Sequence, residues 1–168
     1  IQTEVSGHGI AALKDLTNLE GLILASSKVS DDGMVLFPSF PKLRNLDLSD
    51  TQITVKALVQ LKKLKQLEQL SLAATKVTGT GLSALRELSQ LKRLHLWESA
   101  ISDAGLIGLA ELVQLDELNL HGTGIGDAGL VHLKKLVNLT GLVLSGTKIT
   151  DEGLLHLAGL KKMRVLYI

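Results

Sequence analysis

The sequence contains no cysteine among its 168 residues. This absence excludes a disulfide, a thiolate zinc site and a cysteine nucleophile, and it leaves the redox compartment open. No stretch approaches the roughly 18 consecutive apolar residues of a membrane-spanning helix, and no basic-then-apolar signal segment opens the chain. We therefore expect a soluble protein without membrane insertion.

An excess of one charge is also missing, because 18 basic residues nearly cancel 17 acidic ones and the formal net charge is +1. This balance gives no general attraction to nucleic acid or to an anionic membrane. Basic residues form no stripe that alternates with exposed aromatic residues, so we expect no nucleic-acid partner. A partner that recognises charge must therefore recognise a local patch.

Aromatic residues are scarce at 2% of the chain, whereas hydrophobic residues reach 45%. Aliphatic residues must therefore fill the core in thin repeated layers. Three apolar columns recur every 24 residues without insertion or deletion, a period typical of a solenoid. Their members are Leu19, Leu43, Leu67, Leu91, Leu115, Leu139 and Met163; Leu22, Leu46, Leu70, Leu94, Leu118, Leu142 and Leu166; and Leu24, Leu48, Leu72, Leu96, Leu120, Leu144 and Ile168.

Each unit opens as L-x-x-L-x-L, and the alternation in its last part predicts a short strand with one buried face. The second half of each unit has the spacing of a short helix, as Leu106, Leu109 and Leu112 illustrate. Hydroxyl residues at Ser30, Thr54, Thr78, Ser102 and Thr150 predict helix N-caps, and aspartates follow most of them. Pro38 and Pro41 predict a shortened or 3₁₀ turn in the first repeat.

A further column carries small hydroxyl residues three positions after the third apolar column: Thr3, Ser27, Thr51, Thr75, Ser99, Thr123 and Thr147. A threonine offers one donor and two acceptor lone pairs, which suit the turn that leaves a strand. Repetition in every layer favours this structural role over a nucleophile. We therefore expect that the protein is not an enzyme.

The segments T-K-I-T-D-E-G-L-L-H-L at 147–157 and S-A-I-S-D-A-G-L-I-G-L at 99–109 resemble bacterial 24-residue leucine-rich repeats, and the resemblance covers the whole chain. The chain is also similar to the cysteine-containing repeats of F-box adaptors. Those repeats carry cysteine where this sequence has Thr51, Thr75, Thr123 and Thr147, and this departure argues against a ubiquitin-ligase role. A cytoplasmic protein and a protein exported from a bacterium both fit.

Strands stack about 4.8 Å apart, whereas helices with their side chains are about 10 Å across. The units must therefore fan into a curved, right-handed α/β solenoid, with a parallel sheet on the concave face and short helices on the convex face. We expect one domain over 1–168, formed by a half repeat (1–18), six 24-residue repeats (19–162) and a terminal strand (163–168). The start at Ile1 and the lack of polar caps predict a fragment of a longer array, or ends that pair with another chain.

Residues between the buried leucines form outward rows on the concave face. One row reads Ile23, Asp47, Ser71, His95, Asn119, Val143 and Tyr167, and another reads Gly21, Asn45, Gln69, Arg93, Glu117, Gly141 and Val165. We predict a protein-binding patch centred on Arg93, His95, Trp97, Glu117, Asn119 and His121, flanked by Asn45, Asp47, Gln69 and Glu98. Tryptophan and arginine are enriched at interface hot spots.

Other interpretations of these residues remain open. Trp97 could lie flat over Ala73 and only shield the sheet. The whole array could act as a structural spacer or associate with itself through its ends, and Trp97 with Tyr167 could bind a carbohydrate. A variant that removes Trp97 and Arg93 distinguishes these roles, because only a concave-face binder should lose its partner.

Metal and cofactor sites find little support in the sequence. His95 and His121 are diagonal neighbours at about 7–8 Å between α-carbons, so their rings could converge on a metal. They lack a third strong ligand and a pocket that excludes water. The glycines at Gly122, Gly124, Gly126 and Gly129 lack the lysine of a phosphate loop. We expect no metal and no cofactor.

Overall fold

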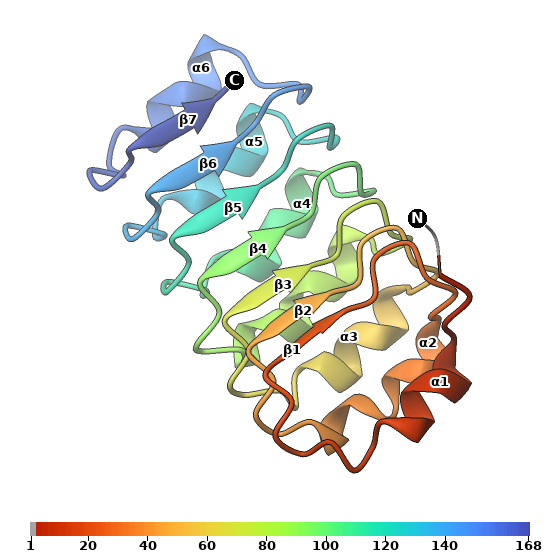
Figure 1. Cartoon of the computed structure of the whole chain (residues 1–168). Helices are drawn as coiled ribbons and strands as arrows, with labels where there is room; N and C mark the ends of the chain where they lie inside the picture. Colours follow the sequence, from red (N-terminus) through yellow and green to blue (C-terminus); the bar gives the residue numbers. More distant parts are fainter. Residues whose placement is uncertain (1–2) are drawn as a thin grey trace.

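The computed structural model describes residues 3–168, so the first two residues of the leading half repeat lie outside the described part. Seven parallel strands form one sheet in sequence order (Figure 1). Each strand has three residues: β1 (Gly21–Ile23), β2 (Asn45–Asp47), β3 (Gln69–Ser71), β4 (Arg93–His95), β5 (Glu117–Asn119), β6 (Gly141–Val143) and β7 (Val165–Tyr167). The predicted parallel sheet is confirmed.

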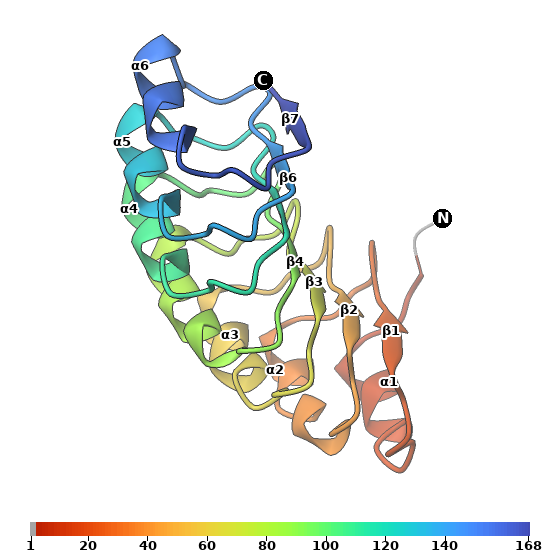
Figure 2. The ribbon, with the colours of Figure 1, turned by 90° about the vertical axis from the view of Figure 1, so that its left-hand side faces the viewer.

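Short helices form the second layer. The α-helices are α1 (Gly7–Ala12), α2 (Asp31–Met34), α3 (Val55–Leu61), α4 (Asp103–Leu106), α5 (Asp127–Leu130) and α6 (Asp151–Leu154). The 3₁₀ helices are η1 (Phe37–Ser39), η2 (Gly79–Glu87), η3 (Ile107–Leu109), η4 (Val131–Leu133) and η5 (Leu155–Leu157). Figure 2 shows the helices along the outer side of an arc and the sheet along its inner side. Within residues 3–168, none of these helices has the length and apolar character needed to cross a membrane.

The leucine columns form the core between the two layers. The middle residue of each strand from β2 to β6 is at most 2% exposed, namely Leu46, Leu70, Leu94, Leu118 and Leu142. Burying one such side chain contributes about 2 kcal/mol. In the first repeat the rings of Phe37 and Phe40 pack edge to face with centroids 6.0 Å apart, around the 3₁₀ turn predicted from the prolines. Each repeat therefore adds one thin aliphatic layer, and the first repeat adds the aromatic exception.

The hydroxyl column closes the turn that follows each strand. The Oγ1 groups of Thr51, Thr75, Thr123 and Thr147 donate to the carbonyl three residues earlier, at 2.6–2.7 Å. Ser99 instead donates to the Leu72 carbonyl of the preceding repeat at 3.0 Å. These hydroxyls satisfy backbone carbonyls that the sheet leaves without a partner. The structural role predicted for this column is confirmed for these residues.

The prediction of local hydroxyl caps is only partly right. Thr54 and Thr150 accept hydrogen bonds from amides of the first helical turn, both at 3.3 Å. Three predicted caps make no such bond, namely Ser30, Thr78 and Ser102. Both caps that form belong to threonines that an aspartate of the preceding repeat also binds.

Aspartates at the first helical position bind across repeats rather than only compensating the helix dipole. Asp31 accepts from the Thr54 amide at 2.8 Å and from its hydroxyl at 2.7 Å. Asp127 binds Thr150 in the same way, with both distances at 2.7 Å. Asp103 accepts from the Gly126 amide at 2.7 Å. An ionised carboxylate is a strong acceptor, so it fixes the start of the next repeat.

Candidate functional site on the inner sheet face

The inner face carries two outward rows, one on each side of a buried leucine row. Alternate residues of a strand point to opposite faces, so the residues beside each buried leucine face outward. The register aligns Gln69, Arg93 and Glu117 in one row, and Ser71, His95 and Asn119 in the other. The neighbours predicted from the alternation are therefore the neighbours observed in the sheet.

Glu117 links two strands at the centre of the predicted patch. One carboxylate oxygen lies 3.2 Å from His95 Nε2, and the other lies 4.0 Å from Arg93 Nε. The side chains of His95, Glu117 and Arg93 are 36%, 45% and 49% exposed, respectively. Exposed ion pairs add little to stability. The three groups are therefore accessible to a partner, and their interactions contribute little to the stability of the fold.

Two of the predicted polar residues also hold the turn that follows their strand. Asn119 Oδ1 accepts from the His121 amide at 3.0 Å, and Asp47 Oδ1 accepts from the Ser49 amide at 2.9 Å. The Ser49 hydroxyl donates to Asp47 at 2.5 Å and lies 2.6 Å from the Ser71 hydroxyl. Side chains of this kind commonly bind their own backbone two residues on. Asn119 and Asp47 therefore have a structural role that sequence reasoning missed.

A charged ladder lies just before the strands. Glu68 forms ion pairs with Arg44 and with Lys92, the second at 2.9 Å. The hydrogen bonds from Lys92 and then from Arg44 hold the pKa of Glu68 below its ordinary value. The one carboxylate of Glu68 is therefore shared between two cations of the chain.

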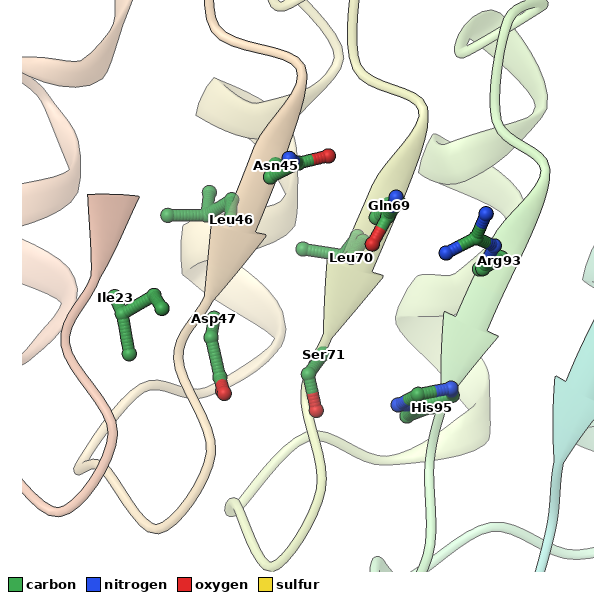
Figure 3. A pocket seen from close by; sticks show the side chains of 9 residues that line it. All are labelled: Ile23, Asn45, Leu46, Asp47, Gln69, Leu70, Ser71, Arg93 and His95. Atoms are coloured by element: carbon green, nitrogen blue, oxygen red, sulfur yellow. The ribbon is translucent and has the colours of Figure 1, made fainter. Parts of the chain in front are cut away.

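A shallow hollow of about 260 Å³ crosses strands β1 to β4 (Figure 3). Its lining residues are Ile23, Asn45, Leu46, Asp47, Gln69, Leu70, Ser71, Arg93 and His95. The structure therefore brings the predicted flanking residues of β2 and β3 together with two residues of the predicted centre. Glu117, Asn119, His121 and Trp97 do not line the hollow and lie toward β5 and the loops after the strands. Ile23 was placed in an outward row but was not predicted as a site residue.

Trp97 follows β4 and is half-buried. Its carbonyl accepts from the Ala74 amide at 2.8 Å, and Ala73 in the preceding repeat is fully buried. Partial burial is compatible with a ring that covers the sheet and also with one that meets a partner. Trp97 remains a predicted contact residue, and binding and thermal melts of a variant without its ring distinguish the two roles.

Glu98, a predicted flanking residue, belongs to a backbone column that sequence reasoning missed. Six residues spaced by 24 have positive φ angles between 51° and 71°: Ser26, Asp50, Ala74, Glu98, Gly122 and Gly146. This left-handed conformation is unfavourable for residues with a Cβ and free for glycine. The two glycines were the available signal. The column turns the chain at the same edge of the sheet in each of these repeats.

The sequence left open that the rings of His95 and His121 converge on a metal ion. His95 is instead directed at Glu117, and Asn119 binds the backbone amide of His121. In the range 3–168, no three histidine, aspartate or glutamate side chains gather closely enough to hold a metal ion. The geometry of this face is that of an open polar surface.

Known leucine-rich-repeat proteins are similar to this chain in sequence and in fold. A family model described as a leucine-rich repeat matches residues 135–158. No curated protein matches the chain. The solved structure of internalin C2 (InlC2) from Listeria monocytogenes is similar with a TM-score of 0.74 and 25% identity, over 99% of this chain and 77% of that one.

Another internalin from Listeria monocytogenes, InlF, is similar with a TM-score of 0.66 and 27% identity over 93% of this chain. The present chain spans about half, 49%, of the length of that structure. The matched repeat, the seven-stranded parallel sheet and these likenesses agree with one another. The chain has the fold of a leucine-rich-repeat solenoid, similar to these internalin structures.

Proposed function

We propose that the chain is a protein-interaction module that binds a macromolecular partner on its inner sheet face. The patch contains Arg93, His95, Trp97, Glu117, Asn119 and His121, flanked by Asn45, Asp47, Gln69 and Glu98. The likeness to internalin structures supports a leucine-rich-repeat scaffold as the framework for such a surface.

One observation carries the proposal. The strands commit only their alternate leucines to the core, and the residues between them point outward on adjacent strands in register. Arg93, His95 and Glu117 are accessible, and folding does not demand their chemistry. A cluster of such groups on a concave, hollowed surface is typical of a site that recognises another molecule.

We propose binding rather than catalysis. The hydroxyl groups most repeated along the chain donate to backbone carbonyls, so they are not placed as nucleophiles beside a base. His95, which pairs with the carboxylate of Glu117, lies on an open sheet surface. A shallow surface of this kind exposes any reacting group to water, whereas catalytic sites generally exclude it.

Capture on beads tests the proposal. The wild-type chain, a variant with Arg93→Ala and Trp97→Ala, and a convex-face control with Lys134→Ala are immobilised at equal density. Mass spectrometry identifies proteins retained by the wild type, and the strongest candidate is then purified for direct titration. We expect the inner-face variant to lose this protein and the Lys134→Ala control to keep it, because Lys134 is exposed on the other layer.

Thermal melts of the same three proteins separate binding from folding. An inner-face variant that binds as well as the control would overturn the proposed site. A collapse of its melt would instead assign Trp97 to packing over Ala73. Retained folding together with lost binding supports the proposal.

A second candidate function is self-association through the last repeat. The exposed fractions of Leu166, Tyr167 and Ile168 are 39%, 59% and 65%, and β7 pairs only with β6 among the described strands. An open strand edge with apolar side chains favours pairing with another chain. Sedimentation of dilute and concentrated samples distinguishes the two functions, because self-association alone predicts a mass that rises with concentration.

A further inference from the structure

The hollow across β1–β4 has chemically different ends. At the β1 end, Ile23 is 77% exposed. At the β4 end lie Arg93 and His95, and Figure 3 shows the amide side chains of Asn45 and Gln69 in line with Arg93. A ligand that fills this hollow therefore meets an aliphatic group at one end and a cationic group at the other.

Arg93 keeps most of its binding capacity free. Its Nε lies 4.0 Å from Glu117, beyond a normal hydrogen bond, and the guanidinium makes no hydrogen bond to any residue in the described range. A guanidinium has five N–H donors in a planar fork that matches a carboxylate. The acid nearest within the hollow, Asp47, is bound to Ser49. The vacant fork therefore fits a carboxylate supplied by a partner.

The wall between the two ends suits a peptide backbone. Asn45 and Gln69 make no side-chain hydrogen bond with the part of the chain that the structure describes, and each amide carries both donors and an acceptor. The buried Leu46 and Leu70 also line the hollow between the two rows. Unpaired amides above an aliphatic floor favour an extended polypeptide, which brings its own donors and acceptors.

The distance between the ends sets the spacing of the ligand. From β1 to β4 there are three strand intervals of about 4.8 Å, and Arg93 lies two residues before His95, the register partner of Ile23, so the two ends are roughly 16 Å apart. An extended chain rises about 3.3 Å per residue, so four residues span about 13 Å, and the long side chains of Arg93 and of the bound acid cover the remaining few ångströms. Residues i and i+4 of an extended chain also point to the same side. An aliphatic and an acidic residue in this relation can therefore meet Ile23 and Arg93 together.

We propose that this hollow binds an extended segment of the partner protein, which carries an aliphatic side chain over Ile23 and a carboxylate on Arg93 four residues away. The proposal rests on the inner face being the binding surface, and it adds the chemistry and spacing of the bound segment. The segment crosses the strands, and its middle residue lies between β2 and β3, where the outward neighbours are polar and a small or polar side chain fits.

Synthetic peptides test the spacing. Each places one leucine and one glutamate in a serine background, three, four or five residues apart and in both orders. They are titrated into the ¹⁵N-labelled chain, and amide shifts of β1–β4 report binding. We expect a peptide with the spacing of four to bind about tenfold more tightly than those with three or five. Equal affinities, or no shifts with any peptide, would overturn the proposal.

Two variants test the assigned ends. Arg93→Ala should abolish the preference for glutamate over glutamine, and Ile23→Ser should abolish the preference for leucine over serine. Both side chains are largely exposed, so both variants should fold, and Lys148→Ala serves as an exposed control outside the hollow. A preference that survives its matching variant would overturn the assignment of that end.

Different results would contradict the peptide proposal and the proposed inner-face site. Peptides without a spacing preference, combined with loss of the whole partner by the Arg93→Ala and Trp97→Ala variant, would remove only the peptide proposal. Retention of the whole partner by that variant would remove the inner-face site itself.

Discussion

The inner and outer layers of this solenoid repeat with different strictness. All seven strands have three residues and the same register, whereas the main helix of a unit varies from four residues in α2 to seven in α3 and nine in η2. The units that begin their helix with aspartate all form a four-residue α-helix. The three exceptions have Gly7, Val55 and Gly79 at that position.

This difference follows from what each layer must satisfy. Each strand from β2 to β6 shares its backbone hydrogen bonds with two neighbours, so a change in length would leave donors and acceptors unpaired. The backbone hydrogen bonds of a helix run along its own segment, so its length can change without breaking a ladder to its neighbours, provided that it buries an apolar stripe. The inner layer is therefore uniform in backbone and free in outward side chains, and the outer layer varies in its backbone.

The largest expected effect tests the shared core beneath the strands. Leu94→Ala should lower the free energy of unfolding by about 2–5 kcal/mol, because Leu94 is fully buried and its neighbours cannot collapse into the space. Ile107→Ala is the matched outer-layer control, since Ile107 is 58% exposed and should change stability by less than about 0.5 kcal/mol. Urea unfolding measures both, and equal losses would contradict the contrast.

The next effect tests a place where the outer layer is also constrained. A Cβ added at Gly105 would lie 2.6 Å from the Gly79 Cα, so the two backbones would have to separate. Gly105→Ala should therefore cost about 1–3 kcal/mol, as overpacking does. Gly159→Ala is the control, because nothing lies within 4 Å of its added Cβ. Similar urea midpoints for both variants would show that the two backbones can separate at Gly105 with little loss of stability.

A smaller effect tests the left-handed column at the edge of the sheet. Gly146 has a φ of 71°, so Gly146→Ala should lower stability by about 1 kcal/mol. Ala74 has a φ of 51° in the same column, so Ala74→Gly should be neutral or slightly stabilising, since relieved strain opposes the added chain entropy. Chemical denaturation compares the pair. A destabilising Ala74→Gly together with a harmless Gly146→Ala would contradict the backbone account.

The smallest effect tests the aspartate bridge between repeats. Asp127 accepts from the amide and then the hydroxyl of Thr150, and these bonds hold its pKa below the ordinary value. Its contribution is therefore present above about pH 4 and is lost as the pH falls through the lowered pKa. Asp127→Ala should lower the Tm by a few degrees at pH 7 and by less at pH 2.

Asp151→Ala provides the control for this bridge. Asp151 occupies the same column and makes no side-chain hydrogen bond within residues 3–168. Its removal should change the Tm less than Asp127→Ala does at pH 7. Equal changes for the two variants would indicate a helix-dipole effect instead of a bridge.

The strands and their register could be predicted from the sequence because both depend on local alternation and on an unbroken period. A leucine such as Leu94 is marked by its neighbours 24 residues away, and the same columns align Arg93 with Glu117. The helix-start bonds could not be predicted in this way. Asp31 binds Thr54 in the next repeat, a contact that depends on how two repeats stack.

Most residues of the candidate site could be predicted from the sequence, but the position of the hollow could not. Alternation turned Asn45, Gln69 and Arg93 outward, whereas the position of the hollow depends on the relative sizes of side chains across four strands. The patch predicted from the sequence is therefore centred near Trp97, whereas the hollow also includes Ile23. The two positions make different predictions for Ile23→Ser and Trp97→Ala.

We propose that the inner face binds a partner and that the aspartate bridges of the outer layer stabilise the fold. The most direct test measures the Kd for the captured partner, together with the Tm, for Trp97→Ala and Asp127→Ala. We predict that Trp97→Ala raises the Kd by about 30-fold at an almost unchanged Tm, as expected of a hot spot. Asp127→Ala should lower the Tm and leave the Kd unchanged. An unchanged Kd in Trp97→Ala, or a Kd that follows the Tm in both variants, would contradict the account.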